Sequence, residues 1–398
     1  MKTEIVTKIE KDSNENQQKN WKELTLEKIA ELSKEVYLPN HDEELSYIGL
    51  EHIDQQTLSL NSIGKSTDVT SSKFRFKNGD ILFGKLRPYF RKVYRPKFSG
   101  ICSTDIWVVR AKSQIDQSWL FYLLTGENFI KLASGGSSGT RMPRADWHHL
   151  KDTAWLVPEL FEQKRIAEIL SSLDDKIELN RKMNSNLEKI ASLLFKQWFI
   201  DVNNQRIGKV SDLIRVESGF SFSSSMFDEG GNYKLVTIKN VQDGYFVTEC
   251  TDSLSTIPEK VPLHCRLNNG DILLSLTGNV GRVCVIYGDN YLLNQRVANL
   301  IPINERDRAF TYFLFRQKDF QDDLIGISRG TAQQNLSPIE TKSLEIMIPS
   351  ENELDRFANI MNPIFQKIVK NYSEIKKLSM LRDLLLPRLM NGKIRVKI

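Results

Sequence analysis

The stretch PELFEQKRIAEILSSLDDKIELNRKMNSNLEKIASLLFKQWFI, residues 158–200, decides the fold, because the chain carries a second copy of it. The second copy, PSENELDRFANIMNPIFQKIVKNYSEIKKLSMLRDLLLPRLMN at residues 349–391, shares eleven identities with the first in 43 positions at an offset of 191 residues. Self-similarity at a constant offset indicates a repeated architecture. The sequence therefore predicts two copies of one structural unit.

The same offset continues upstream of both stretches. Asn78-Gly79-Asp80-Ile81-Leu82 matches residues 269–273, and Gly139-Thr140 matches Gly330-Thr331. Short apolar runs separated by Gly, Asn, Asp and Ser predict strands joined by turns. A short helix is expected near residues 117–132 and again near 308–324. Each unit is thus predicted to be a mixed α/β domain followed by a long helix.

The two long helices are predicted over Glu159–Ile200 and Glu351–Met390, each on the order of 60 Å long. Apolar residues recur in alternating steps of three and four, which is a heptad seam. Pro363 and Pro387 are expected to kink or end the second helix. Either each helix packs on its own domain, or the two seams bury each other as an intramolecular coiled coil. Asn180 and Asn371 occupy equivalent seam positions, and the hypothesis is that they set the alignment.

The composition is that of a folded, mildly basic protein. The chain has 398 residues, 40% hydrophobic and 26% charged, a formal net charge of +5 and a pI of about 8.8. This charge permits a nucleic-acid partner without requiring one. No apolar run of about 18 residues and no apolar leader segment are seen, so a cytoplasmic protein without a membrane span is expected. The four cysteines form no CxxC pair and are expected to be reduced thiols.

No catalytic motif is convincing, so the chain is predicted not to be an enzyme by itself. Asn362-Pro363-Ile364-Phe365 is similar to the NPPF-type loop of adenine methyltransferases, but it lacks the second proline and lies inside a predicted helix. No glycine-rich nucleotide fingerprint follows a strand. His148 and His149 are adjacent and make poor joint metal ligands. Neither a catalytic site nor a metal site is predicted.

Two kinds of segment are candidates for contact with DNA. Residues 73–98 hold nine basic residues interleaved with aromatics, and strand alternation would place several on one face to neutralise phosphates; the alternative is a solvated, charge-guarded strand edge. The loops at 134–144 and 328–336 match across the repeat, and a loop at 277–282 belongs to the second unit. Their Gly, Ser, Thr, Asn, Gln and Arg suit base edges and phosphates, although plain turn chemistry would also explain them. The candidate DNA-binding residues are Lys85, Arg87, Tyr89, Arg91, Ser137, Ser138, Thr140, Arg141, Arg144, Thr277, Asn279, Arg282, Arg329, Thr331, Gln333, Gln334 and Asn335.

Several of these segments resemble one known family. KRIAEILSSLDDKI at 164–177 resembles the central conserved helix of the specificity subunit of Type I restriction–modification systems. Tyr47–Ile53, Asn78–Leu82, Thr277–Gly281 and Leu293–Arg296 resemble recurrent segments of its target-recognition domains. The resemblance covers the whole chain apart from about the first 20 residues.

The resemblance implies a non-catalytic subunit in which two target-recognition domains each recognise half of a split DNA site. Two long helices would form an antiparallel coiled coil, related by a pseudo-two-fold repeat, that sets the spacer and docks two methyltransferase subunits. Restriction subunits, with nuclease and translocase activity, would join them. S-adenosylmethionine, ATP and Mg would be bound by these partners, and no cofactor by this chain. The coiled-coil and partner residues are expected to be Ile166, Leu170, Leu173, Ile177, Asn180, Leu187, Leu194, Trp198, Ile364, Ile368, Asn371, Leu378 and Leu385.

The predicted domain plan follows from the repeat and the resemblance together. It consists of a polar segment (1–20), the first target-recognition domain (21–157), the central helix (158–201), the second target-recognition domain (202–348), the C-terminal helix (349–392) and a tail (393–398). Three alternatives stay open. They are a specificity subunit of a fused restriction–methylation enzyme, a free-standing DNA-binding regulator, and an enzyme with an unrecognised site. The neighbouring genes separate the first two from the main prediction, and activity of the purified chain alone would revive the third.

Overall fold

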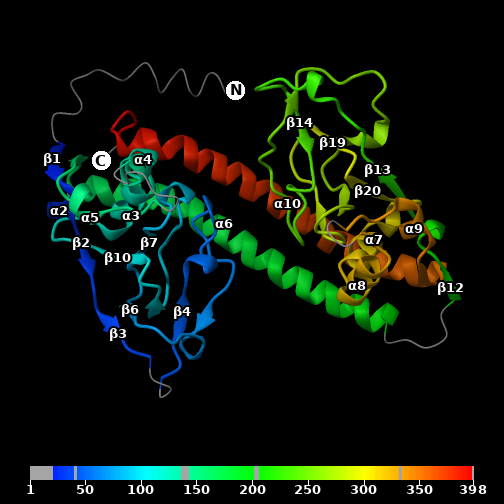
Figure 1. Ribbon diagram of the computed structural model, residues 1–398, viewed down its shortest axis with the longest axis horizontal. Helices are drawn as coiled ribbons and strands as arrows, with labels where there is room; N and C mark the ends of the chain where they lie inside the picture. Colours follow the sequence, from blue (N-terminus) through cyan, green and yellow to red (C-terminus); the bar gives the residue numbers. More distant parts are fainter. Residues whose placement is uncertain (1–20, 40–42, 136–142, 201–205, 331–333, 397–398) are drawn as a thin grey trace. The chain divides into compact units, whose positions relative to one another are not determined.

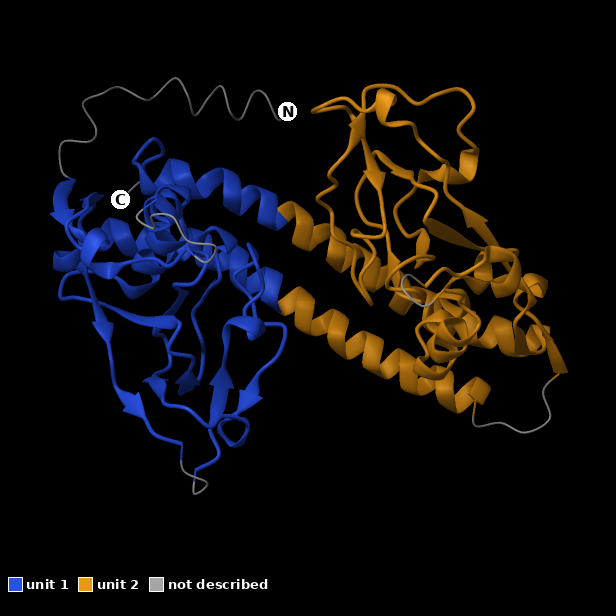
Figure 2. Cartoon of the chain, viewed as in Figure 1, with its two compact units in different colours: residues 1–178, 378–398 blue, residues 179–377 orange. Residues whose placement is uncertain are grey.

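The chain folds into two compact units, seen in a computed structural model that describes residues 21–39, 43–135, 143–200, 206–330 and 334–396. Unit 1 combines residues 1–178 with 378–398, and unit 2 consists of residues 179–377 (Figures 1 and 2). Unit 2 is therefore inserted into unit 1 along the chain. Among the described helices, none combines the length and the apolar character that crossing a membrane requires.

Unit 1 contains three sheets. Their strands are β1 (Lys22–Thr25), β2 (Ala30–Ser33), β3 (Val36–Tyr37), β4 (Ser46–Ile48), β5 (Gly64–Lys65), β6 (Lys73–Phe76), β7 (Ile81–Gly84), β8 (Val93–Tyr94), β9 (Gly100–Cys102), β10 (Ile106–Ala111) and β11 (Ala154–Val157). The strand orders are β2-β10-β7-β8, β3-β6-β9-β4-β5 and β1-β11. The helices are α2 (Leu26–Ile29), α3 (Gln117–Thr125), α4 (Glu127–Gly135), α5 (Trp147–Leu150), the first part of α6 (Leu160–Phe195) and the last part of α10 (Glu351–Met390).

Unit 2 follows a similar plan. Its strands are β12 (Arg206–Lys209), β13 (Ile214–Ser218), β14 (Tyr233–Val236), β15 (Ser253–Leu254), β16 (Arg266–Leu267), β17 (Ile272–Ser275), β18 (Val283–Val285), β19 (Tyr291–Leu293), β20 (Val297–Pro302) and β21 (Glu345–Ile348). They are ordered β13-β20-β17-β18, β15-β14-β19-β16 and β12-β21. The helices are α7 (Arg308–Phe315), α8 (Lys318–Gly326), α9 (Pro338–Ser343) and the remaining parts of α6 and α10.

The repeated Asn-Gly-Asp motif has the same structural role in both units. Gly79 and Gly270 adopt positive φ values of 86° and 93°, which suit glycine in a tight turn. The following aspartates accept backbone N–H groups, Asp80 from Lys77 and Asp271 from Asn268, each at 2.8 Å. The turn delivers the chain into the buried strands β7 and β17, which pair antiparallel with β10 and β20. The repeat thus marks where each central sheet begins, and the predicted mixed α/β architecture is confirmed.

Each unit has one apolar core that includes the long helices and a second formed by residues of its two larger sheets. In unit 1, Ile166 and Leu170 of α6 pack with Leu389 of α10 and with Trp119 of α3. In unit 2, Phe195 of α6 packs near Phe357 of α10, with ring centroids 5.8 Å apart, and near α7. The long helices are therefore part of the core of both units.

The extents of the long helices agree with the prediction, with one correction. A π-helical turn, Lys196–Ile200, follows α6, and α10 runs unbroken from Glu351 to Met390. The expectation that Pro363 or Pro387 could end the second helix is wrong. Both prolines lie on its exposed side, where water can bond the carbonyl that proline leaves without a partner. Each predicted short helix is a pair of helices, α3 with α4 and α7 with α8.

The two long helices run antiparallel wherever they meet within a unit. Asp174 meets Arg382 in unit 1, and in unit 2 Asn184 meets both Ile368 and Asn371. Among the predicted seam residues, the buried ones are Ile166, Leu170, Ile177, Asn180, Ile368 and Asn371, and the half-buried ones are Leu173, Leu187, Leu194, Trp198, Ile364, Leu378 and Leu385.

The two equivalent asparagines do not bond to each other. The Asn371 side-chain amide donates to Asn184 Oδ1 at 2.7 Å, and that of Asn180 donates to Glu374 Oε2 at 3.1 Å. The buried polar layer of the helix pair in unit 2 therefore pairs Asn371 with Asn184 rather than with its sequence equivalent.

Candidate nucleic-acid interface

In unit 1, two loops that the sequence singled out lie side by side. Leu86, in the β7–β8 connection, forms an antiparallel bridge with Arg144, which precedes α5. The Arg87 N–H donates to the Pro143 carbonyl, and the Ala145 N–H to that of Lys85, each at 2.8 Å. These backbone bonds hold the two loops as one surface element, called loop pair 1 here (residues 85–91 and 143–145).

Unit 2 builds the same element at the equivalent positions. Thr277 bridges Asn335, and the Gly278 N–H donates to the Gln334 carbonyl at 3.0 Å. The Thr277 hydroxyl also donates to Asn335 Oδ1 at 2.8 Å. Thr277 and Asn335 follow Leu86 and Arg144 by 191 residues, so loop pair 2 (residues 277–282 and 334–336) repeats loop pair 1.

Loop pair 1 holds an arginine in a strained backbone conformation. Arg87 has φ 50° and ψ 62°, while its equivalent in unit 2 is Gly278, at φ 76°. A left-handed conformation costs about 1–2 kcal/mol for a residue with a Cβ. The Arg87 Nε is buried without a hydrogen-bond partner, and its guanidinium lies over the Phe90 ring, 5.9 Å from the centroid. Strained residues of this kind cluster at binding sites.

Arg91 also has a positive φ, 49°, and its Nε is likewise buried without a hydrogen-bond partner. Burial lowers the pKa of its half-buried guanidinium, opposed by the neighbouring Asp383. Tyr89 between the two arginines is exposed. Of the three, Tyr89 is therefore the most accessible to a ligand at the surface.

Three of the basic residues expected to contribute to a basic face over residues 73–98 are engaged within unit 1. Lys73 is buried and donates to Ser71 Oγ at 2.7 Å, and burial lowers its pKa. Arg75 pairs with Glu43 at 2.9 Å, and Lys97 with Asp175 at 2.9 Å and Glu178 at 3.1 Å. At loop pair 1 itself, the basic side chains are grouped around one acidic residue. Lys85 and Arg144 flank Asp105, with N–O distances of 3.8 and 3.5 Å.

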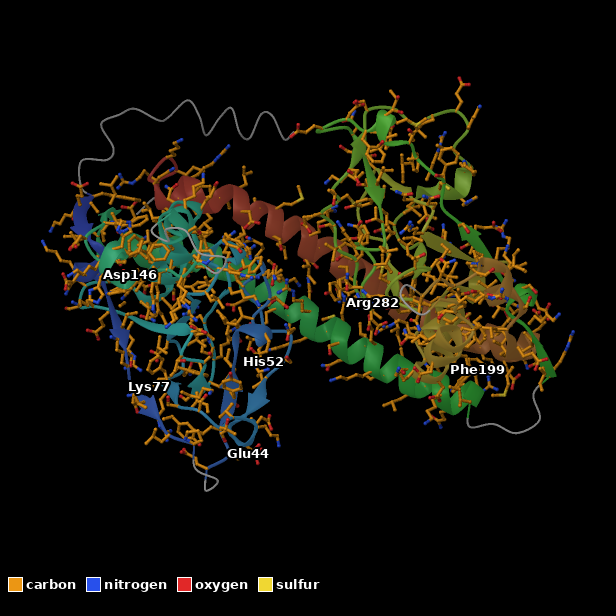
Figure 3. All side chains as sticks on the ribbon, in the orientation of Figure 1. Glu44, His52, Lys77, Asp146, Phe199 and Arg282 are labelled. Carbon is orange, nitrogen blue, oxygen red and sulfur yellow. The ribbon has the colours of Figure 1, made fainter. Side chains whose placement is uncertain are left out.

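Loop pair 2 presents mainly amides. Asn279, Gln334 and Asn335 are exposed, and Thr277 is buried. Arg282, labelled in Figure 3, donates to Gln242 Oε1. Arg329 is exposed and pairs with Glu340. A cavity of about 290 Å³ adjoins the loop, lined by Asp243, Gly278, Asn279, Val280, Gly281, Arg282, Gln321, Ile325 and Gln334.

The remaining candidates lie outside the described residues. These are Ser137, Ser138, Thr140 and Arg141 of the first matched loop and Thr331 and Gln333 of the second.

Two residues that hold the loops in place had no signal in the sequence. Asp105 balances Lys85 and Arg144, and Gln242 accepts from Arg282. Gln242 lies 40 residues before Arg282 in an irregular segment, so no periodicity or spacing connects them. Only the folded chain shows these contacts.

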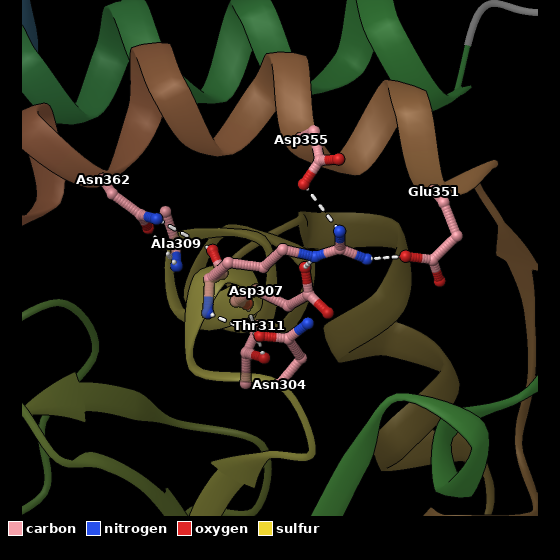
Figure 4. Close-up of polar contacts among 8 residues, drawn as sticks. Asn304, Asp307, Ala309, Thr311, Glu351, Asp355 and Asn362 are labelled. Atoms are coloured by element: carbon pink, nitrogen blue, oxygen red, sulfur yellow. Dashed lines mark hydrogen bonds and ion pairs between the residues drawn. The ribbon is translucent and has the colours of Figure 1, made fainter.

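The segment that is similar to a methyltransferase loop has a structural role (Figure 4). The Asn362 side chain accepts the Ala309 N–H at 3.2 Å and donates to the Arg306 carbonyl at 2.8 Å, so it caps the start of α7 from α10. Arg306 also pairs with Asp355 at 2.6 Å. Among the described residues, no group of three or more His, Cys, Asp or Glu could hold a metal ion, and all four cysteines are free.

Comparisons with known proteins agree with this two-unit plan. The family described as "Type I restriction modification DNA specificity domain" matches residues 18–189 and 203–378. The chain is 26% identical to the Type I restriction enzyme HindI specificity subunit of Haemophilus influenzae, over 81% of this chain and 88% of that protein. It is 29% identical to the MjaIX specificity subunit of Methanocaldococcus jannaschii, over 72% of this chain and 71% of that protein.

A solved structure shows the same fold. The crystal structure of a Type-I restriction-modification system S subunit from M. genitalium aligns with a TM-score of 0.56 and 18% identity, over 95% of this chain and 97% of that one. The family matches each half of the chain once and most of the chain in total. The chain therefore belongs to the family of Type I restriction modification DNA specificity domains, of which it carries two copies.

Proposed function

We propose that this chain is the non-catalytic subunit that gives a Type I restriction–modification complex its DNA sequence specificity, and that each unit recognises one half of a split site. The observation that carries the proposal is the loop pair, which is built twice on the same backbone plan with different side chains. One architecture with two chemistries suits two unrelated half-sites. Loop pairs 1 and 2, with the neighbouring candidates 137–141 and 329–333, are the proposed DNA contacts.

The two loop pairs differ in the chemistry they offer to DNA. Loop pair 1 presents Lys85, Arg87 and Arg144, which can neutralise phosphates and, for arginine, pair with guanine in the major groove. Loop pair 2 presents Asn279, Gln334 and Asn335, amides of the kind that pair with adenine. The half-sites are accordingly expected to differ in base composition.

The long helices are proposed to set the spacer and to dock two methyltransferase subunits. Several large apolar side chains on them are exposed in spite of the buried seam. They are Phe161, Ile169, Leu179, Ile190 and Leu193 on α6 and Ile360, Met380, Leu381 and Leu384 on α10. Exposed apolar surface of this kind marks interaction sites. S-adenosylmethionine would be bound by the methyltransferase subunits, and ATP and Mg by the restriction subunits that join them.

The first test is methylome sequencing of a host without other DNA methyltransferases. The host expresses the neighbouring methyltransferase subunit with and without this chain. Modified adenines at one split motif, present only when the chain is present, would support the specificity role and identify the target. The same motif without the chain would overturn it.

A second test addresses the helices. Deleting one heptad from α6 and the facing heptad from α10 is expected to shorten the spacer of the methylated motif. An unchanged spacer in a folded, active deletion variant would refute a ruler role for the helix pair.

A further inference from the structure

In unit 1, three side chains form a hydrogen-bonded cluster centred on helix α6. It consists of Tyr122, Asp174 and Arg382 and is called the unit 1 node here. The hydroxyl of Tyr122, a fully buried α3 residue, donates to Asp174 Oδ2 at 2.7 Å. The other carboxylate oxygen of Asp174 accepts from Arg382 of α10 at 2.9 Å, and Arg382 is itself buried. One carboxylate thus joins the recognition domain to both long helices.

Unit 2 contains a node of the same chemistry at different positions. Tyr312 of α7 is fully buried and donates to Glu188 Oε1, also on α6, at 3.0 Å. Arg316 reaches Glu188 Oε2 at 3.5 Å. Burial raises the pKa of Glu188, which the nearby Arg316 opposes. The residues of the two nodes do not occupy equivalent positions at the 191-residue offset. The similar chemistry of the two nodes therefore does not follow from the sequence repeat.

The unit 2 node connects to loop pair 2. Arg316 pairs with Asp243, which lines the cavity at the loop and accepts from Gln321 at 2.9 Å. The adjacent Gln242 accepts from Arg282. The Tyr372 hydroxyl of α10 donates to the carbonyl of the next residue, Gly244, at 3.0 Å. The turn 242–244 therefore joins Arg282 to both long helices.

We propose that Asp174 and Glu188 are positioning residues for DNA recognition, each fixing the angle at which its recognition domain sits on its own segment of α6. Apolar packing between a domain and a helix is non-directional and tolerates small rotations. Hydrogen bonds from the buried Tyr122 and Tyr312 hydroxyls to these half-buried carboxylates are directional and costly to break. The node therefore selects one orientation from those that packing alone allows. This inference rests on the proposed function, because orientation matters only if the loop pairs contact DNA.

The test compares node variants with a matched control in the full chain assembled with its methyltransferase subunits. The node variants are Tyr122→Phe with Asp174→Asn, and Tyr312→Phe with Glu188→Gln. The control is Asp80→Asn, which breaks a carboxylate–arginine pair, Asp80–Arg110 at 2.8 Å, between the turn before β7 and strand β10, a pair that includes no residue of α6. Binding is measured to DNA duplexes carrying both half-sites with the natural spacer, or with one base pair more or fewer.

Spacer discrimination is the ratio of the affinity for the natural spacer to the affinity for a spacer altered by one base pair. In the node variants this ratio is expected to fall about tenfold, which corresponds to the loss of one charge-assisted hydrogen bond. Discrimination against base changes within each half-site should persist, and Asp80→Asn should leave spacer preference unchanged. Unchanged spacer discrimination in the node variants, or an equal loss in Asp80→Asn, would overturn the inference. Absence of split-site binding by the wild-type complex would instead overturn the proposed function.

Discussion

Arg87→Gly should weaken DNA binding without substantially destabilising the fold, because the strained backbone and the proposed DNA contact belong to the same residue. The substitution places in loop pair 1 the residue that loop pair 2 carries at the same position, Gly278. It removes the side chain proposed to contact DNA and leaves the backbone free to keep φ 50°. Affinity should fall while the fold is kept or stabilised, the opposite of what an ordinary structural arginine would show.

The magnitudes follow from the local geometry. Relief of left-handed strain contributes about 1–2 kcal/mol. Against it stand about 0.5–1 kcal/mol for the greater freedom of glycine in the unfolded chain and about 0.5 kcal/mol for the lost contact with the Phe90 ring. The net effect lies between a loss of about 0.5 kcal/mol and a gain of about 1 kcal/mol, a change of at most roughly 4 °C in Tm. Loss of one arginine contact to a base should weaken DNA binding by about 1–3 kcal/mol, roughly 5- to 150-fold.

Thermal unfolding and titration of the methylated target site are the assays. The matched control is Gln114→Gly, at another left-handed position of unit 1, with φ 67° and outside the loop pair. It should show a similar change in Tm and no change in affinity. A clear loss of stability in Arg87→Gly with unchanged affinity would refute the reasoning, because Arg87 would then be a structural residue.

Three further predictions concern the helix pair, the thiols and the charges. Asn371→Leu should cost about 1–3 kcal/mol in urea unfolding, since Asn184 Oδ1 loses its buried donor, and Asn184→Leu in the same chain should restore part of the loss; no restoration would argue against their coupling. Burial raises the pKa of Cys102 to about 12 and of Cys250 to about 11, so both should react slowly with thiol reagents at pH 8 until the chain unfolds. Because these folded pKa values lie above that of a free thiol, stability should decline as pH rises above about 8.5, by up to about 1.4 kcal/mol per unit for each thiol, and Cys102→Ala should make this decline shallower. Arg144→Gln should reduce the salt slope of log Kd by about one phosphate contact, and an unaltered slope would exclude that contact.

The parts of the fold that depend on local pattern could be predicted from the sequence. The heptad spacing and the repeat offset located both long helices to within a few residues, because helix periodicity is a property of neighbouring positions. The predicted end of the second helix at its prolines was wrong. The free-energy cost of a proline inside a helix depends on whether it lies on the solvent-facing side, and packing decides which side that is.

The candidate interface shows the limit more sharply. Basic and aromatic residues marked the 85–91 loop, and glycine and polar side chains marked the other loops, but neither pattern indicated the backbone bridges that join them. Arg75 and Lys97 pair with residues of other segments of unit 1, and Lys73 is buried and bonds to the nearby Ser71, so the basic run did not reveal which of its charges are engaged within the fold. The partner of Asn371 depends on the register of two helices, and equivalence across the repeat predicts position, not pairing.

The division of the chain into a continuous unit 2 and a discontinuous unit 1 has a consequence for protein synthesis. The ribosome completes residues 179–377 before it makes the α10 segment whose Leu386 and Leu389 cover Ile166 and Leu170. Until then the first recognition domain carries an open apolar face, the kind of surface that attracts chaperones or aggregates. A chain interrupted just after unit 2 would keep its second domain and lose the first. Translation through the last turns of α10 is thus needed to cover the apolar face of the first domain.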